Sequence, residues 1–263
     1  MRLRYCALVA MFVATPAIAQ DRDYCPARPG LGDTSCTIAP GRVSVEIGVA
    51  DWARDKSGGD LTDTMTIADT LIRAGIGEAT EIDLGWTPYV HARVRGAGGT
   101  VTHADGVGDV TVALRQNLSH PDGSGFSITL EPFATLPVGT GPGGAGDWSA
   151  GVVIPASFDL HHGLSLQSTT RIAAETDSDG HGRHFAMGEV MGLSIALSDA
   201  VSATAELQVV RDEDPAGATT QDYAGLSLAW GVSDDLQLDM GAVAGLNRAA
   251  GDVELYTGVS RRF

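Results

Sequence analysis

Apolar and polar residues alternate with period two along most of the chain, in segments of about ten residues. In the first segment Val43, Val45 and Ile47 alternate with Ser44 and Glu46. Successive side chains of a β-strand point to opposite faces of a sheet, so each segment predicts a strand with one apolar and one polar face. The predicted strands lie near residues 43–49, 63–74, 81–86, 109–118, 128–136, 148–158, 164–172, 191–197, 206–209, 225–232, 236–241 and 252–263.

Two places depart from this pattern. Segment 63–74 carries apolar residues on both faces, so the sequence does not assign its register. Glu189 falls on the apolar face of its strand, and either a β-bulge or a position at the membrane edge would explain it.

The predicted connections alternate between short ones, such as 198–200 and 233–235, and longer ones, such as 52–62, 95–107 and 174–184. Outer-membrane barrels have short periplasmic turns, longer external loops and an even number of strands. In lipid an open sheet edge would leave backbone groups unpaired, so the sheet is expected to close. The sequence therefore predicts an all-β fold: one closed antiparallel transmembrane β-barrel of about twelve strands with both termini periplasmic. A soluble β-sandwich is the alternative fold.

The first residues are typical of an export signal. Arg2 and Arg4 precede an apolar run, and Ala17-Ile18-Ala19 has the small-x-small pattern of a cleavage site. The run is shorter than the roughly 20 residues that a transmembrane helix needs. We expect a cleaved signal peptide over residues 1–19, an N-terminal periplasmic segment over 20–41 and the barrel over 42–263.

The chain is acidic, with a formal net charge of −16, or −18 without Arg2 and Arg4. A charge of this sign argues against nucleic acid or an anionic surface as a partner. The expected surroundings are outer-membrane lipid and lipopolysaccharide in a Gram-negative cell envelope, and the expected ligand is a small-molecule solute.

Cys25 and Cys36 are the two cysteines outside the signal, and they lie in a segment rich in proline and glycine. An even pair in an exported protein predicts a disulfide, with free thiols as the alternative. Two sulfurs without nearby ligands do not make a metal site.

Several short motifs occur in one order along nearly the whole mature chain. They are Arg28-Pro29-Gly30, Pro40-Gly41-Arg42, residues 71–78 with 81–85, 106–110, Leu136-Pro137-Val138-Gly139 and residues 258–263. In these the chain resembles the family of outer-membrane transporters associated with meta-pathway phenol degradation. The resemblance implies an outer-membrane barrel. It also implies that the terminal Phe263 is the signal read by the barrel-assembly machinery.

Charged residues on the polar faces are candidates for the lumen, because a charge facing lipid at the membrane midplane costs roughly 2–4 kcal/mol. If they line water they set selectivity for small solutes, and if they pair with one another they plug the barrel. The candidates are Glu46, Arg93, Arg115, Glu131, Arg171, Glu206, Asp239, Glu254 and Arg262.

Other chemistry is sparse. Asp177 and Asp179, in a loop with His181 and His184, resemble the start of a calcium loop that lacks its later bidentate glutamate. A solvated acidic loop is the favoured interpretation, with weak divalent-cation binding as the alternative. Ser119-His120 is a turn dipeptide without an evident orienting carboxylate. No nucleophile elbow, phosphate-binding loop or zinc-protease helix occurs, so we expect neither an enzyme nor a cofactor.

Passive passage of a small solute across the outer membrane is the first functional hypothesis. An aromatic or hydrophobic solute is suggested by the family resemblance alone. A structural or surface-interaction barrel with a plugged lumen is the alternative.

Overall fold

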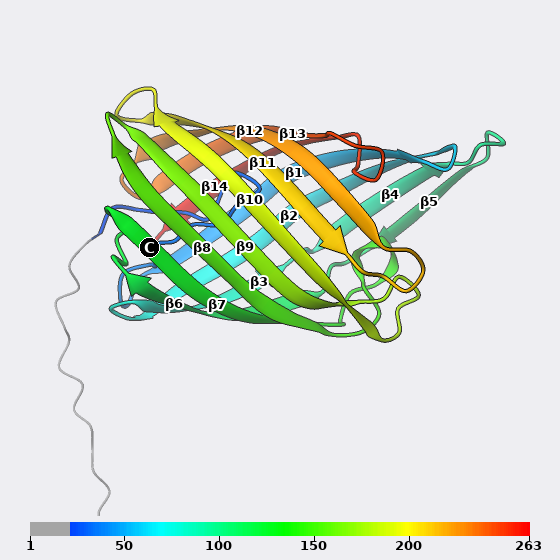
Figure 1. The fold of residues 1–263 in the computed structure, drawn as a ribbon, viewed down its shortest axis with the longest axis horizontal. Coiled ribbons are helices and arrows are strands. Elements are labelled where there is room, and N and C mark those ends of the chain that lie inside the picture. Colours follow the sequence, from blue (N-terminus) through cyan, green and yellow to red (C-terminus); the bar gives the residue numbers. More distant parts are fainter. Residues whose placement is uncertain (1–21) are drawn as a thin grey trace, which may run out of the picture.

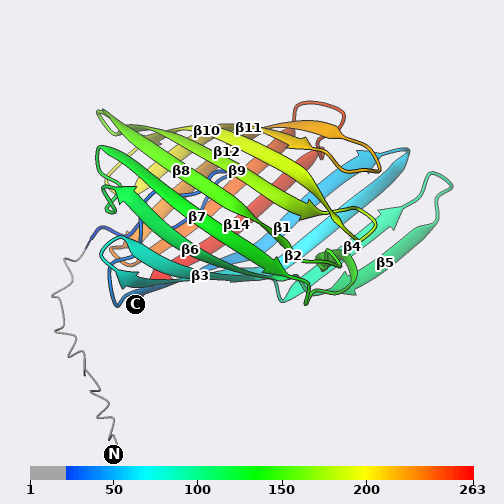
Figure 2. The ribbon, with the colours of Figure 1, turned by 60° about the horizontal axis from the view of Figure 1, so that its bottom comes forward.

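The computed structural model describes residues 22–263, so the expected signal peptide lies outside the described residues. The described chain winds into a tilted antiparallel barrel (Figures 1 and 2). No helix in this part of the chain is long and apolar enough to cross a membrane. The elements are β1 (Val43–Ser57), β2 (Asp60–Gly77), β3 (Thr80–Trp86), β4 (Tyr89–Arg95), β5 (Val101–Gly106), β6 (Val110–Ser119), β7 (Phe126–Leu136), η1 (Gly141–Gly143), β8 (Ser149–His161), β9 (Leu164–Thr176), β10 (Arg183–Ala196), β11 (Val201–Asp212), β12 (Thr219–Ser233), β13 (Leu236–Gly245) and β14 (Val253–Arg262).

The sheet closes on itself because β1 pairs with β2 on one side and with β14 on the other. Two strands of the wall are interrupted. The first consists of β3 and β4, which both pair with β2. The second consists of β6, which pairs with β3, and β5, which pairs with β4. Counting each interrupted strand once gives the predicted twelve. Pro88 lies in the first interruption and has no N–H to donate. Closure confirms the barrel and excludes the stacked sheets of a sandwich.

A backbone irregularity explains why the register of segment 63–74 could not be read from the sequence. Ala68 in β2 is left-handed, with φ of 59°. On one side of it Thr62 and Thr64 line a lumen cavity, whereas on the other side Arg73 is fully buried inside the barrel. The inward positions therefore change from even to odd numbers at Ala68, and no single period fits the segment.

Two predicted loops are largely strand. The predicted loop 52–62 is the end of a long hairpin, in which β1 and β2 meet at Gly58 and Gly59 with positive φ values of 60° and 94°. The predicted loop 95–107 contains β5, which pairs with β4 in a ribbon that extends beyond the rest of the barrel (Figure 1). Period-two alternation is weak there because polar residues occupy both faces.

The two faces of the wall have opposite chemistry. Outward side chains are apolar and exposed, with Leu207, Leu226 and Met240 at 60%, 61% and 58% exposure. Inward side chains are polar and buried, such as Ser44, Glu46 and Ser127. This is the reverse of a soluble protein and suits a barrel whose outer face contacts hydrocarbon.

Glu189 lies on the outward face near the middle of β10. Pairing with β9 and β11 runs through Glu189 without a shift, which rules out a bulge, the first of the two alternatives. Instead, the hydroxyls of Ser168 and Thr170 on β9 donate to its two carboxylate oxygens, at 2.7 and 2.5 Å. These bonds reduce the cost of placing the carboxyl among apolar neighbours.

Arg22, the first described residue, and the C-terminus lie at the end of the barrel that carries the short turns. The guanidinium of Arg262 donates to the backbone carbonyl of Arg22, and the backbone N–H of Phe263 donates to Val43 O at 2.8 Å. Figure 2 shows the C-terminus at that same end. That this end is periplasmic stays a prediction.

The outward and inward faces can be tested at neighbouring positions of β11. Leu207→Arg places a charge on the outer face and is expected to lower the free energy of unfolding in bilayers by about 2–4 kcal/mol. Gln208→Arg is the matched control, because Gln208 lines a lumen cavity, and it should change that free energy far less. Urea titration in lipid vesicles measures both, and equal effects would contradict the assignment of faces.

Candidate functional site: the lumen and its N-terminal segment

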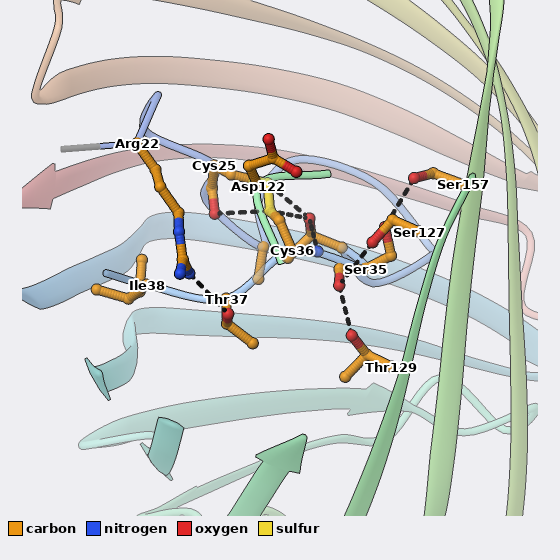
Figure 3. The surroundings of a disulfide bond; sticks show 12 residues. Arg22, Cys25, Ser35, Cys36, Thr37, Ile38, Asp122, Ser127, Thr129 and Ser157 are labelled. Carbon is orange, nitrogen blue, oxygen red and sulfur yellow. Dashed lines mark hydrogen bonds between the residues drawn. A yellow bond between two sulfur atoms is a disulfide. The ribbon is translucent and has the colours of Figure 1, made fainter. Parts of the chain in front are cut away.

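Residues 22–42, here called the N-terminal segment, lie inside the barrel (Figures 1 and 3). Their backbone N–H groups donate to carboxylates of the wall. Those of Ala27 and Arg28 reach Glu46 at 2.9 and 3.1 Å, and those of Leu31 and Gly32 reach Glu206 at 2.8 and 2.9 Å. From the sequence we expected residues 20–41 to form a periplasmic segment separate from the barrel. It lies within the barrel because an irregular backbone needs partners for its N–H groups and the lumen supplies them.

Gly30 shows why the local sequence permits this docking. Its φ is +124°, a conformation that residues with a side chain rarely adopt, and a Cβ there would lie 2.7 Å from a carboxylate oxygen of Glu206. Glycine thus lets the chain turn against Glu206, so that the next two N–H groups reach the same carboxylate.

The disulfide between Cys25 and Cys36 is present and closes the N-terminal segment into a loop (Figure 3). Beside it, Ser35 anchors the loop to the wall. Its carbonyl accepts hydrogen bonds from Asn117 Nδ2 at 2.8 Å and from the Thr129 hydroxyl, and its own hydroxyl lies 2.7 Å from Ser157 Oγ. A covalent loop loses less conformational freedom when it docks, which favours the inserted position.

Arg115 is the centre of the largest charged cluster. It is 1% exposed, and its guanidinium lies 2.9 Å from Asp33, 2.6 Å from Glu131, 3.0 Å from Glu81 and 3.2 Å from Asp83. It also donates to the carbonyl of Thr34 at 2.6 Å. Asp33 and Thr34 belong to the N-terminal segment, so this one side chain joins the segment to the wall.

Arg73 makes a second junction of the same kind. It is fully buried, it pairs with Glu46 at 3.2 Å and Glu81 at 2.9 Å, and it donates to the carbonyls of Cys25 and Cys36. Burying such charges is costly unless every partner is in place, so the two arginines and their carboxylates hold one arrangement. Arg73 was missed because the register of its strand was unassigned. Glu81 and Asp83 could have been found, since they alternate with Ile82 and Leu84.

Most predicted lumen residues do face inward. Arg262 pairs with Asp235 at 2.7 Å, Asp239 pairs with Arg28 at 3.0 Å, and Arg171 stacks on Phe133 at 4.6 Å from its centroid. The others that lie in the lumen are Glu46, Arg115, Glu131, Glu206 and Glu254.

Arg93 is placed wrongly by the sequence. It pairs with Asp63 at 3.3 Å, and Asp63 lies between the inward-facing Thr62 and Thr64 on the opposite face of β2. Arg93 therefore lies on the outer face. The cause is the interruption at Thr87 and Pro88, opposite Ala68 of β2, where the buried positions change from odd numbers in β3 to even numbers in β4.

Open space remains on both sides of the N-terminal segment. A cavity of about 400 Å³ toward the long loops is lined by Leu31, Gln208, Tyr223 and others. A cavity of about 350 Å³ on the opposite side is lined by Pro26, Cys36 and Ser157, among others. A third, of about 380 Å³, contains Asp51, Arg171 and Glu254. The segment thus lies between open compartments of the lumen.

The Ser119–His120 pair lacks the third group that hydrolytic chemistry needs. Ser119 Oγ lies 3.0 Å from His120 Nδ1, but the same nitrogen lies 2.9 Å from the carbonyl of Phe126. Asp122 instead accepts from Ser124 at 2.9 Å. The geometry is that of a turn.

The Arg115 cluster can be tested by removing its cation. Arg115→Met leaves several buried carboxylates without their counter-charge and should lower the free energy of unfolding by about 3–5 kcal/mol. The control is Arg211→Met, because Arg211 pairs with Glu213 at the surface and should contribute at most about 1 kcal/mol. Urea titration of both variants gives the difference, and a small effect at Arg115 would show that the cluster does not hold the lumen together.

Comparison with solved structures shows the same fold. The COG4313 outer membrane channel from Pseudomonas putida F1 matches with a TM-score of 0.67 at 13% identity, covering 90% of this chain and 99% of that one. The NanC porin matches at 0.53 and 8% identity, covering 82% and 98%. The translocator domain of autotransporter NalP from Neisseria meningitidis matches at 0.52 and 16% identity, covering 84% and 88%.

No curated protein matches the sequence. A family model described as "Putative MetA-pathway of phenol degradation" matches residues 27–263, which include most of the N-terminal segment and the whole barrel. The match covers the order of motifs noted in the sequence, and we conclude that the chain belongs to this family, on the fold of outer-membrane barrels.

Proposed function

We propose that the protein is a passive outer-membrane channel for a small solute, with the N-terminal segment forming its constriction. The observation that carries this proposal is the polar lumen, which keeps cavities of about 400 and 350 Å³ on the two sides of the segment. The likeness of the fold to channels and porins supports the same function.

The class of solute is inferred from the family rather than from the geometry of the lumen. The family's description names phenol degradation, which makes a small aromatic or hydrophobic molecule the first candidate. Carboxylates outnumber guanidinium groups along the described lumen, and Asp51 and Glu254 line one cavity together. Such walls favour cations over anions, so among ions we expect a preference for cations.

The chain would reach the membrane by export. We propose cleavage after Ala19, transit to the outer membrane, and assembly by the barrel machinery through Phe263, with lipid and lipopolysaccharide around the outer face. The mass of the mature chain tests the first step: it should begin at Gln20, and a retained leader would contradict the proposal.

Conductance in planar bilayers tests the role of the N-terminal segment. The double variant Glu206→Gln, Asp239→Asn removes two carboxylates that hold it, at the N–H groups of Leu31 and Gly32 and at Arg28. The expected result is a larger single-channel conductance than in the unaltered chain, with more frequent opening. Asp179→Asn, outside the lumen cluster, is the control and should leave the conductance unchanged.

A barrel with a permanently closed lumen is the second candidate, and the dense bonding of the N-terminal segment favours it. Heat-modifiable gel mobility first verifies that each variant is folded and inserted. Absence of current from both the unaltered chain and the double variant would then contradict the channel and support the closed barrel.

A further inference from the structure

At the long-loop end of the barrel, His184 lies among three carboxylates. His184 is the second residue of β10 and faces inward, since Phe185 beside it is exposed on the outside. Its Nδ1 lies 3.0 Å from Asp177, its Nε2 lies 3.0 Å from Asp212, and its Nδ1 lies 3.8 Å from Asp214. Asp177 comes from the β9–β10 loop, Asp212 from the end of β11, and Asp214 from the β11–β12 loop.

The imidazole is buried but not fully bonded. Its side chain is only 5% exposed. Nδ1 is hydrogen-bonded to Asp177, whereas the buried Nε2 has no hydrogen-bond partner, although Asp212 Oδ1 lies within ion-pair distance. Nε2 and the facing Asp212 oxygen lie close enough to act as two neighbouring ligands of a single cation.

One ligand atom each from His184, Asp212 and Asp214 lies within 4.8 Å of the others, close enough to share one ion. The 3.0 Å between Nε2 and Asp212 is near the edge, roughly 3.3 Å, of a tetrahedron with zinc–ligand bonds of about 2.0 Å. The hydrogen bond from Nδ1 to Asp177 would fix the ring tautomer, as metal-bound histidines commonly require.

The carboxylate of Asp214 is held in place, as a metal ligand would be. Backbone N–H groups of Ala216 and Ser178 donate to its two oxygens at 2.6 and 2.7 Å and fix the orientation of the carboxylate. Because Ser178 lies in the other loop, this carboxylate already joins the two loops.

We propose that His184, Asp212 and Asp214 form a binding site for a divalent transition metal of the zinc class at the long-loop mouth of the barrel, with Asp177 orienting the histidine. An imidazole among carboxylates selects such a metal over calcium or magnesium, which prefer oxygen ligands alone. The ion would join the β9–β10 and β11–β12 loops. The sequence singled out Asp177 and Asp179, but Asp179 only accepts the backbone N–H of His181 and is not part of the site.

Titration with Zn²⁺ tests this proposal on the full chain without a polyhistidine tag, folded in detergent and followed by calorimetry. The unaltered chain should bind one Zn²⁺ through this site. Asp177→Asn should weaken binding roughly 10- to 100-fold, because it removes only the orienting group. His184→Gln should weaken it more. His181→Gln, in the same loop, and His103→Gln, which belongs to the separate His91–His103 pair on β4 and β5, should leave this affinity unchanged.

Gel mobility after heating shows whether each variant is folded, and Co²⁺ absorption gives a second readout that does not depend on stability. Tetrahedral Co²⁺ bands that disappear in His184→Gln support the site. The proposal is overturned if the unaltered chain binds no Zn²⁺ in stoichiometric amount, if His184→Gln binds as tightly, if a control histidine variant loses the binding, or if Ca²⁺ binds in preference. None of these results depends on whether the barrel conducts solutes.

Discussion

The structure depends on one constraint: every backbone N–H and C=O group of a sheet with an apolar outer face needs a hydrogen-bond partner. Because Leu207, Leu226 and similar side chains point outward, the edges of the sheet meet hydrocarbon, where an unpaired backbone group costs several kcal/mol. Pairing of β1 with β14 removes those edges. Closure then forces the other face of every strand into an interior that must accept Ser, Thr, Asn, Arg and carboxylate side chains.

That interior is completed by the chain itself. Arg73 and Arg115 are almost inaccessible to solvent, and each binds both wall carboxylates and carbonyl oxygens of the N-terminal segment. In the opposite direction, Glu46 and Glu206 accept N–H groups of the segment. The charged side chains of the wall and the backbone N–H and C=O groups of the irregular segment thus serve as hydrogen-bond partners for one another. Each partner supplies hydrogen bonds that the other lacks, so the segment is part of the lumen rather than an appendage.

Period-two alternation was enough to find the barrel, its strand number and most of the lumen charges. It failed where the backbone breaks the period. Ala68 inverts the faces of β2, which hid Arg73. The interruption at Thr87 and Pro88 inverts the faces between β3 and β4, which put Arg93 on the wrong side. Alternation also gives no information about an irregular segment. Cys25 and Cys36 therefore predicted a disulfide but not its place inside the barrel. The cluster at His184 escaped for another reason: Asp212 and Asp214 join it only when two loops meet in space.

Hydrogen exchange of the backbone amides in the N-terminal segment tests the central claim most directly. If the segment is held in the lumen, the amides of Ala27, Arg28, Leu31 and Gly32, which donate to Glu46 and Glu206, should exchange slowly, like those of the barrel strands. Exchange of these four amides at the rate of an unstructured peptide, in a barrel whose strands remain protected, would contradict the account.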